Sequence, residues 1–313
     1  MKSTSEYHEQ FQSPGLASWG HLEGYPSASR QFAFKNILFA TDFSSTTELG
    51  LPYAVEIARR SGGTIHAVHV VQPDVYPLLP PSEWPKIAEE ERVFREEKRN
   101  QLEQELEGVP HDFLFPAGDV WKNLAHIVQE KNIDLLILGT HGRTGMAKVL
   151  VGSIAEKAFR QATCPVLTVG PAVASKTNHA LAAMNRILYA TDFSRESLTA
   201  VPYAVCLAKK HGADLILMHS VQNEESVQVD SVCYTLRDVV PAGAGLESKV
   251  KCVVERGAPE EAILRAAKEH EADLIILGVR NIQGHPTAIA RLSRSIAYKV
   301  VTGAACPVLT VRG

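Results

Sequence analysis

Two short segments of the sequence combine residue types that suit the binding of phosphate and of polar ligand groups. One follows an apolar run and reads Ala40-Thr41-Asp42. The other is a glycine-rich element with the spacing Gly139-x2-Gly142-x9-Gly152-Ser153. A glycine lets the backbone approach a phosphate without a Cβ in the way, and a serine adds a hydroxyl donor. The second segment therefore indicates a phosphate site.

The elements around these segments place them at one edge of a sheet. Residues 37–40 and 135–138 are continuous apolar runs, as expected for parallel strands covered on both faces. In such a sheet, ligands bind beyond the carboxyl ends of the strands, where the strand order reverses. The glycine-rich element also leads into a predicted helix over 148–161, whose first N–H groups would attract an anion.

Plainer interpretations of the same residues stay open. The glycines could be ordinary loop residues, and Asp42 could cap a turn or a helix, because Asp-Phe-Ser favours capping. For His69 and His219, a packed histidine at a strand end is favoured over a ligand contact. The sequence has no Walker A loop, and no G-x-G-x-x-G follows the first predicted strand.

The chain contains a tandem duplication. The octapeptide ILFATDFS at 37–44 recurs as ILYATDFS at 187–194. Three further matches follow in the same order: PYAV at 52 and 202, DLLILG at 134 with DLIILG at 273, and CPVL at 164 and 306. Collinear matches over this length indicate two copies of one domain.

Each copy is predicted to alternate strands with helices. In the first copy the predicted helices are Thr46–Arg60 (N-cap Ser44 or Ser45, terminator Gly62-Gly63), Glu83–Leu106, a helix capped by Asp119 that runs to Lys131, and Lys148–Gln161. The predicted strands are 37–40, 65–71, 112–115, 135–138 and 166–169. The second copy repeats the pattern, with a shorter and less helical segment at 223–248. This alternation is typical of a parallel, doubly wound α/β sheet.

The predicted organisation is a tail, two domains and a linker. Residues 1–34 fit neither copy and are rich in Ser, Gly and Pro but carry aromatics, so they read as a disordered tail or as a docking arm. Residues 35–170 form the first domain, 171–184 the linker and 185–313 the second domain.

Composition excludes several classes of protein. The net charge of −3 over 313 residues, without a local basic cluster, argues against a nucleic-acid partner. The sequence has no apolar run as long as the roughly 18 residues needed to cross a bilayer. Five scattered cysteines without a CxxC pair argue against a disulfide framework or a zinc site. A reducing, cytoplasmic location is therefore expected.

The motifs resemble one known family. The octapeptide, the element G-T-H-G-x9-G-S and the closing C-P-V-L-T-V are similar to those of universal stress proteins, here in tandem form, with the ATP-binding type of motif in the first copy. The resemblance implies two tandem doubly wound open sheets, each of five parallel strands in the order 3-2-1-4-5, with helices on both faces.

The resemblance also implies a site for ATP, with Mg or Mn bridging phosphate oxygens and no metal ligand from a protein side chain. Adenine would meet the end of the first strand and the backbone of the second, at Ala40, Thr41, Asp42 and Val70. Ribose and phosphates would meet the glycine-rich element, at Gly139, Gly142, Gly152, Ser153 and the amide of Ile154. His141 and Arg143 would be additional phosphate neighbours.

The second copy departs from the motif. Gly142 is replaced by Asn281, Gly152 by Arg294 and Val70 by Ser220, and three residues are inserted between the two glycine positions. Arg280, Arg291 and Arg294 would fill the phosphate pocket or hold a different anion. We expect a degenerate nucleotide site in this copy.

Three functions are compatible with these features. The favoured one is an ATP-binding regulatory protein of the stress response. The second is a slow ATPase or a self-phosphorylating enzyme, with His141 as the nearby base and Ser153 or a neighbouring hydroxyl as acceptor. The third is an interaction scaffold, in which the duplication matters more than any ligand. The resemblance also implies that the strands at 166–169 and 308–311 pair within the chain, with the second domain as pseudo-dimer partner of the first, which would cover two exposed sheet edges. Homodimerisation of whole chains stays open.

Overall fold

The computed structural model describes residues 33–71, 80–140, 152–175, 183–221, 227–280 and 295–313. The strands are β1 Asn36–Ala40, β2 Thr64–Val68, β3 His111–Leu114, β4 Leu135–Gly139, β5 Val166–Val169, β6 Arg186–Ala190, β7 Asp214–Val221, β8 Val250–Arg256, β9 Leu274–Val279 and β10 Val308–Arg312. The α-helices of the first half are α1 Ser45–Glu48, α2 Leu51–Ser61, α3 Trp84–Glu105, α4 Val120–Glu130 and α5 Ser153–Gln161. Those of the second half are α6 Arg195–Leu198, α7 Val201–His211, α8 Val229–Asp238, α9 Pro259–Glu269 and α11 Ile296–Gly303.

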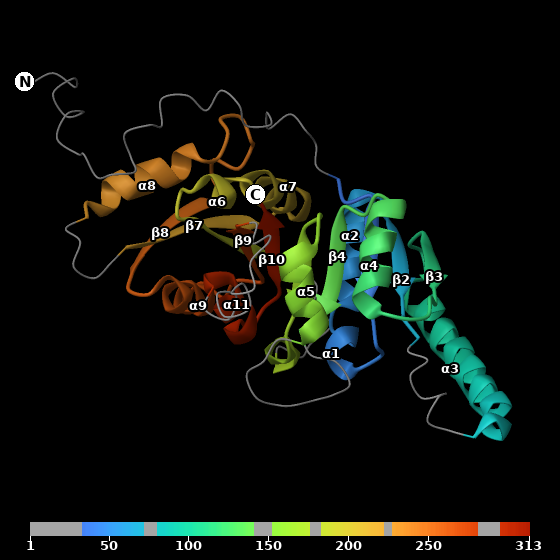
Figure 1. The fold of residues 1–313 in the computed structure, drawn as a ribbon. Coiled ribbons are helices and arrows are strands. Elements are labelled where there is room, and N and C mark those ends of the chain that lie inside the picture. The colour runs from blue at the N-terminus through green and yellow to red at the C-terminus, as the bar shows by residue number, and fades with distance from the viewer. Residues whose placement is uncertain (1–32, 72–79, 141–151, 176–182, 222–226, 281–294) are drawn as a thin grey trace, which may run out of the picture. The chain divides into compact units, whose positions relative to one another are not determined.

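The strands form one ten-stranded sheet in the order β3-β2-β1-β4-β5-β10-β9-β6-β7-β8 (Figure 1). Within each half the pairs of neighbouring strands are parallel, and the order is the predicted 3-2-1-4-5. The predicted α/β fold, with a doubly wound parallel arrangement in each copy, is therefore confirmed.

The two halves meet through antiparallel pairing of β5 with β10, with Leu167 opposite Leu309. Two buried threonines support this junction. The hydroxyl of Thr168 donates to the carbonyl oxygen of Val308 at 3.1 Å. Thr310 donates to Val166 at 3.3 Å. Because each strand would otherwise expose an unpaired edge, the pairing covers both edges within one chain.

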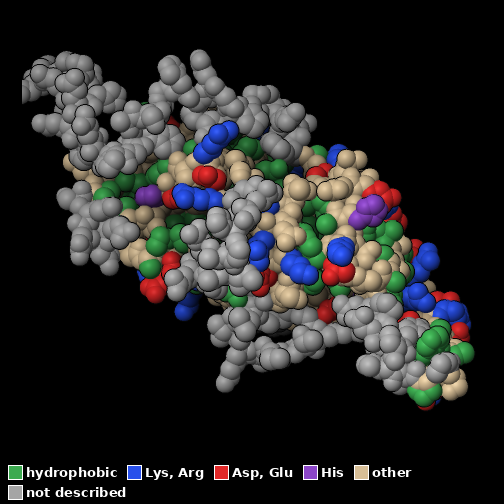
Figure 2. Space-filling view, in the orientation of Figure 1, with side chains coloured by type: hydrophobic (Ala, Val, Ile, Leu, Met, Phe, Trp, Pro, Cys, Tyr) green, Lys and Arg blue, Asp and Glu red, His purple; other side chains and the backbone are tan. Residues whose placement is uncertain are grey.

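Helices cover both faces of the sheet. On one face, α4, α5, α9 and α11 pack on an apolar cluster that runs through both halves and includes Leu38, Leu136 and Ile275. The charged side chains visible on this side have both signs and are interspersed (Figure 2). In the described residues, no helix is long and apolar enough to cross a membrane.

On the other face, α2 packs against α7, and two tyrosines reach across reciprocally. Tyr53 of the first half lies near Cys306 of the second, and Tyr203 of the second lies near Asp134 of the first. Burial, reinforced by these neighbours, raises the pKa of both phenols. The duplicated PYAV motif therefore builds the contact between the copies.

The helix predicted over Thr46–Arg60 is two helices, α1 and α2, separated at Leu49 and Gly50. Pro52 lies at the second position of α2. A proline inside a continuous helix would clash with the carbonyl four residues earlier, so the chain restarts the helix one residue before it. Pro202 produces the same break between α6 and α7.

Other predicted bounds shift by a few residues. β2 ends at Val68 rather than Val71, at the residue opposite Leu114, where β3 also ends. The His69 N–H still donates to the Leu114 carbonyl at 3.0 Å. β3 begins one residue early, at His111. α5 begins at Ser153, while the predicted start at 148 and most of the tail fall outside the described residues.

Candidate functional site

The predicted site residues of the first half gather at the carboxyl ends of three neighbouring strands. β1 leads into Thr41 and Asp42, β2 leads to Val70, and β4 ends in Gly139. Gly152, Ser153 and Ile154 begin α5. The predicted contacts His141, Gly142 and Arg143 lie outside the described residues.

The start of α5 is joined directly to the end of β4. The N–H of Gly152 donates to the carbonyl oxygen of Thr140 at 2.6 Å, and the N–H of Thr140 donates to Val169 of β5 at 3.0 Å. Thr140 is 1% exposed. The glycine-rich element therefore brings its two ends together, although twelve positions separate Thr140 from Gly152 in the chain.

Within the described residues, no side chain caps the first turn of α5. Gly152 occupies the N-cap with φ −56° and ψ 151°, and it has no side chain to accept from the following amides. In the second half, Ser295 caps α11 by accepting from the N–H of Tyr298 at 3.2 Å. Because first-turn amides lack partners within the helix and carry a partial positive charge, the start of α5 suits an anion better than that of α11.

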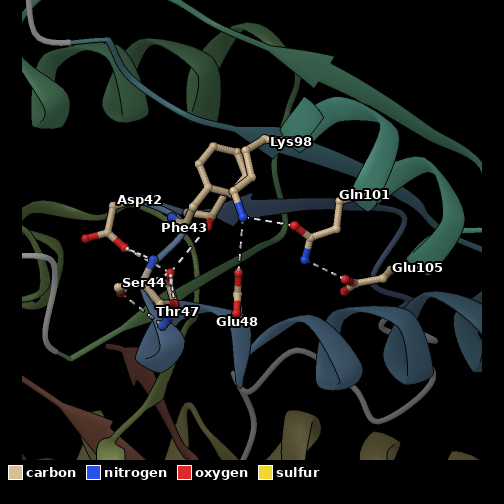
Figure 3. A network of polar contacts seen from close by, with 9 residues as sticks. Asp42, Phe43, Ser44, Thr47, Glu48, Lys98, Gln101 and Glu105 are labelled. Carbon is tan, nitrogen blue, oxygen red and sulfur yellow. Dashed lines mark hydrogen bonds and ion pairs between the residues drawn. The ribbon is translucent and has the colours of Figure 1, made fainter. Parts of the chain in front are cut away.

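Asp42 builds the turn that follows β1. Its Oδ1 accepts from the N–H of Ser44 at 3.0 Å and from the hydroxyl of Thr47 at 2.9 Å (Figure 3). The buried Thr41 uses its hydroxyl in the same turn, accepting from the N–H of Phe43 at 2.9 Å. The capping interpretation of Asp42 therefore holds for Oδ1, one of the two carboxylate oxygens. The same hydrogen bonds fix the position of the carboxylate.

Asp192 occupies the corresponding turn of the second half. It accepts from the N–H of Ser194 at 3.0 Å and from the hydroxyl of the same serine at 2.5 Å. Burial raises the pKa of Asp192, but the hydrogen bonds from Ser194 and Ser197 outweigh it, so the net pKa is below its usual value. The turn is thus a structural feature of both copies.

Phe43 was not predicted as a site residue, yet its backbone sets the turn. It has φ +59°, and Phe193 in the second half has φ +60°. Left-handed φ is uncommon for a bulky residue and needs support from its surroundings. His69 supplies support, since its ring packs 4.8 Å from that of Phe43 while its Nδ1 lies 2.9 Å from the Thr41 carbonyl oxygen.

His219 repeats both interactions, with its ring 4.7 Å from Phe193 and its Nδ1 2.8 Å from the Thr191 carbonyl. The packed-histidine interpretation agrees with this geometry. The sequence signal that could have identified Phe43 is the phenylalanine that both octapeptides contain at this position.

The long helix α3 packs onto this turn in the first half. Phe94 meets the ring of Phe43 edge-on at 5.7 Å, and the ammonium group of Lys98 lies 5.4 Å from the centre of the same ring. Lys98 also lies 3.9 Å from Glu48 and donates to Gln101 at 2.9 Å (Figure 3). The Asp42 turn therefore contacts a helix that extends away from the sheet (Figure 1).

Gly139 has a packing reason that the spacing did not reveal. A Cβ at this position would lie 2.8 Å from Cγ2 of Thr47, and one at Gly278 would overlap the carbonyl oxygen of Glu196. Both halves therefore need this glycine so that a short helix can pack over the fourth strand. This packing requirement is a reason for Gly139 in addition to the approach of a ligand expected from the sequence.

Half-buried apolar side chains surround the same strand ends. Ala40, Val70, Ile154, Leu114 and Val120 pack against the core cluster on the α4 and α5 side. The last two were not predicted. The N–H groups of His69 and Val71 bond toward β3, and successive residues of a strand direct their backbone groups to alternate sides. Val70 therefore directs its backbone groups toward the end of β1.

Comparison with known proteins assigns both halves of the chain to one family. The model of the universal stress protein family matches residues 33–170 and again 184–312. A universal stress protein of Methanocaldococcus jannaschii is 30% identical over 142 residues, which cover 44% of this chain and 82% of that protein.

One solved structure agrees in fold over most of the chain. A universal stress protein of Archaeoglobus fulgidus matches 90% of this chain and 99% of its own with a TM-score of 0.71 at 24% identity. Another solved member, in complex with cAMP, is 26% identical and covers 42% of this chain and 98% of its own, with a TM-score of 0.34. Since the family model matches both repeated halves and the sheet has the expected strand order in each, this chain belongs to the universal stress protein family in tandem form.

Proposed function

We propose that the first half of this chain binds ATP and that the second half is its pairing partner in a regulatory stress-response protein. The observation that carries the proposal is the difference in N-cap residue between α5 and α11, the corresponding helices of the two halves. α5 begins after a glycine, without a side-chain cap, beside Thr140. α11 begins after Ser295, which caps the helix itself.

The start of α5 would hold the phosphate tail. A phosphate oxygen would accept from the amides of Ser153 and Ile154, and a charged acceptor makes stronger bonds than a neutral one. Ser153 is exposed, so its hydroxyl can join them. Gly142, His141 and Arg143 complete this part of the proposed site.

The adenine would lie over the half-buried apolar side chains at the strand ends. Ala40, Val70 and Ile154 offer apolar contact to the ring, and the Val70 backbone is directed toward its edge. Asp42 is held in place at the end of β1 by the hydrogen bonds of its turn. Apolar walls with a few fixed polar groups are typical of nucleotide sites.

A divalent cation, Mg or Mn, would accompany ATP by bridging phosphate oxygens. Mg²⁺ at nucleotides usually keeps several waters and relies on the phosphates for much of its coordination. Its part in the proposal is to neutralise phosphate charge beside the α5 amides.

The second half would not bind ATP. Its turn at Ala190, Thr191 and Asp192 keeps the form of the first, but Arg294 stands where the first half has Gly152, and Ser295 caps α11 by accepting from the N–H of Tyr298. Its role in the proposal is the junction of β10 with β5 and the contact of α7 with α2.

Isothermal titration of the whole chain with Mg-ATP tests the proposal. We expect one ATP per chain, and Gly152→Arg, which introduces the second half's own residue, should abolish binding with an unchanged circular dichroism spectrum. Ala258→Arg is the matched control because it places an arginine at the exposed N-cap of α9. Two ATP per chain, or full affinity in Gly152→Arg, would contradict the proposal.

Single-turnover assays on the same proteins separate binding from catalysis. Turnover that is lost in His141→Ala while ATP still binds would assign hydrolysis to the site. ATP bound without turnover supports a regulatory role.

A further inference from the structure

Two of the five cysteines lie against each other at the outer edge of the second half. Cys233 is on α8 and Cys252 is on β8, the last strand of the sheet. The Sγ of Cys252 lies 3.5 Å from the carbonyl oxygen of Cys233, and both residues are half-buried. By contrast, Cys164 and Cys306 are buried beside β5 and β10.

The surroundings of Cys252 show that the two thiols interact. Burial raises the pKa of Cys252, the neighbouring Cys233 thiol raises it further, and the Arg237 side chain opposes both. Arg237 lies one helical turn after Cys233 on α8. A thiol pair beside a guanidinium group, partly open to solvent, is the type of environment in which cysteines react with oxidants.

We propose that Cys233 and Cys252 form an intramolecular disulfide on exposure to a peroxide and thereby tie α8 to the edge strand β8. The inference does not depend on the nucleotide site, since neither residue belongs to it. It also agrees with a reducing location, where disulfides that form transiently act as oxidant sensors.

The reaction balances with hydrogen peroxide as the oxidant. The thiolate of Cys233 attacks one peroxide oxygen, the O–O bond breaks, and a sulfenic acid and hydroxide form. The thiol of Cys252 then attacks the sulfenic sulfur, the S–S bond forms and a second hydroxide leaves. The two thiol protons convert both hydroxides to water, so two electrons from the thiols reduce one peroxide to two waters. Burial disfavours the Cys252 thiolate, so the first attack on the peroxide is assigned to Cys233.

The disulfide would covalently fix the exposed surface of α8, which is otherwise held in place by packing. α8 exposes Val229 and Tyr234, whose exposed fractions are 49% and 70%. A disulfide from the middle of α8 to β8 would hold these side chains in one position over the sheet edge. Oxidation would therefore change the rigidity of an exposed apolar surface.

Peptide mapping after peroxide treatment tests the proposal. The whole chain is treated with hydrogen peroxide, free thiols are alkylated, and the protein is digested without reductant. We expect a linked peptide pair containing Cys233 and Cys252, the loss of two alkylation sites, recovery with dithiothreitol, and a rise in melting temperature of about 5 °C or more.

Three variants make the test specific. Cys233→Ser and Cys252→Ser should each abolish the linked peptide and the thermal shift, whereas Cys206→Ser, which changes another half-buried cysteine, should keep both. Circular dichroism checks that each variant is folded, and Cys252→Ala replaces Cys252→Ser if it is not. Five alkylatable thiols after excess peroxide, a different pairing, or a disulfide between two chains would overturn the proposal.

Discussion

The N–H of Gly152 donates a 2.6 Å hydrogen bond to the carbonyl oxygen of Thr140, and this bond joins the start of α5 to the end of β4. Since Thr140 is itself bonded to β5, the first amides of α5 are fixed relative to the sheet without a ligand. A site that is fixed in advance loses less conformational entropy when it binds.

Giving α5 a capping serine like that of α11 should weaken the proposed phosphate site. In Gly152→Ser, the new hydroxyl would accept from the first-turn amides of α5 and compete with phosphate, so we expect ATP affinity to fall about tenfold, or about 1.4 kcal/mol. Isothermal titration measures this. The control Ser295→Gly should lower stability by a few tenths of a kcal/mol and leave ATP affinity unchanged. Equal or tighter binding by Gly152→Ser would mean that the amides do not hold the ligand.

Adding a Cβ at Gly139 should destabilise the fold even without nucleotide. The new atom would lie 2.8 Å from Cγ2 of Thr47, so Gly139→Ala should cost about 1–3 kcal/mol of unfolding free energy in urea. Combining it with Thr47→Ser, which removes that methyl group and keeps the hydroxyl bonded to Asp42, should recover part of the loss.

Gly278→Ala provides the comparison. Its Cβ would meet the backbone of α6 rather than a side chain, so the loss should be larger than in Gly139→Ala. If neither variant were destabilised, Gly139 would be kept for its ligand alone.

His211 should make stability depend on pH. Its side chain is 2% exposed, Glu56 lies 3.9 Å away, and neither ring nitrogen has a hydrogen-bond partner among the described residues. Burial is the main cause that lowers the pKa of His211 to about 4. The positive charges of Arg60 and Lys210 also lower it, and the negative charge of Glu56 opposes the shift. The unfolded chain takes up this proton near pH 6.5 and the folded chain does not, so stability is complete above pH 6.5 and falls as pH drops toward 4.

We expect His211 to account for about 2–3 kcal/mol of that loss between pH 6.5 and 4. In urea unfolding at a series of pH values, His211→Leu should flatten the profile. The control His126→Gln changes a histidine of α4 whose side chain is 74% exposed, and it should leave the profile unchanged. An unaltered profile in His211→Leu would show that this proton uptake does not limit folding.

Removing the Phe94 side chain should weaken ATP binding indirectly, through its contact with Phe43. Phe94→Ala deletes the edge-on contact with Phe43, and an aromatic pair contributes about 0.5–1.5 kcal/mol beyond its buried area. The left-handed turn that holds Asp42 would then lose support, so we expect ATP affinity to fall several-fold in isothermal titration. Lys98→Met, which removes the charge over the same ring, should have the smaller effect, because exposed cation–π contacts contribute about 0.5–1 kcal/mol. Unchanged affinity in both variants would separate α3 from the site.

Much of the fold could be predicted because it depends on local patterns. Continuous apolar runs mark β1, β4, β6 and β9, and caps such as Asp119 and Gly62 mark helix ends, with Gly62 at φ 59°. The repeats then assign the same order of elements to both halves. The break between α1 and α2 was missed, although Pro52 signals it, because apolar periodicity continues across the break.

Part of the candidate site could not be predicted because its residues act through contacts distant in the chain. Gly139 packs on Thr47, Phe43 on His69 and Phe94, and Leu114 and Val120 come from a third strand and a helix start. Spacing identified the glycines and Asp42 by their types. It could not show which of their atoms are already used by neighbouring elements.

The sequence by itself determined the duplication, the alternation of strands and helices, and the strand ends at which Asp42 and the glycine-rich element lie. These follow from periodicity and capping, which act over a few residues. Only the tertiary structure decided that β5 and β10 join two sheets into one, that Tyr53 and Tyr203 cross between the halves, and that one helix start is capped while its counterpart is not. The physical reason is that backbone pairing and side-chain packing between segments about 150 positions apart depend on the folded chain as a whole.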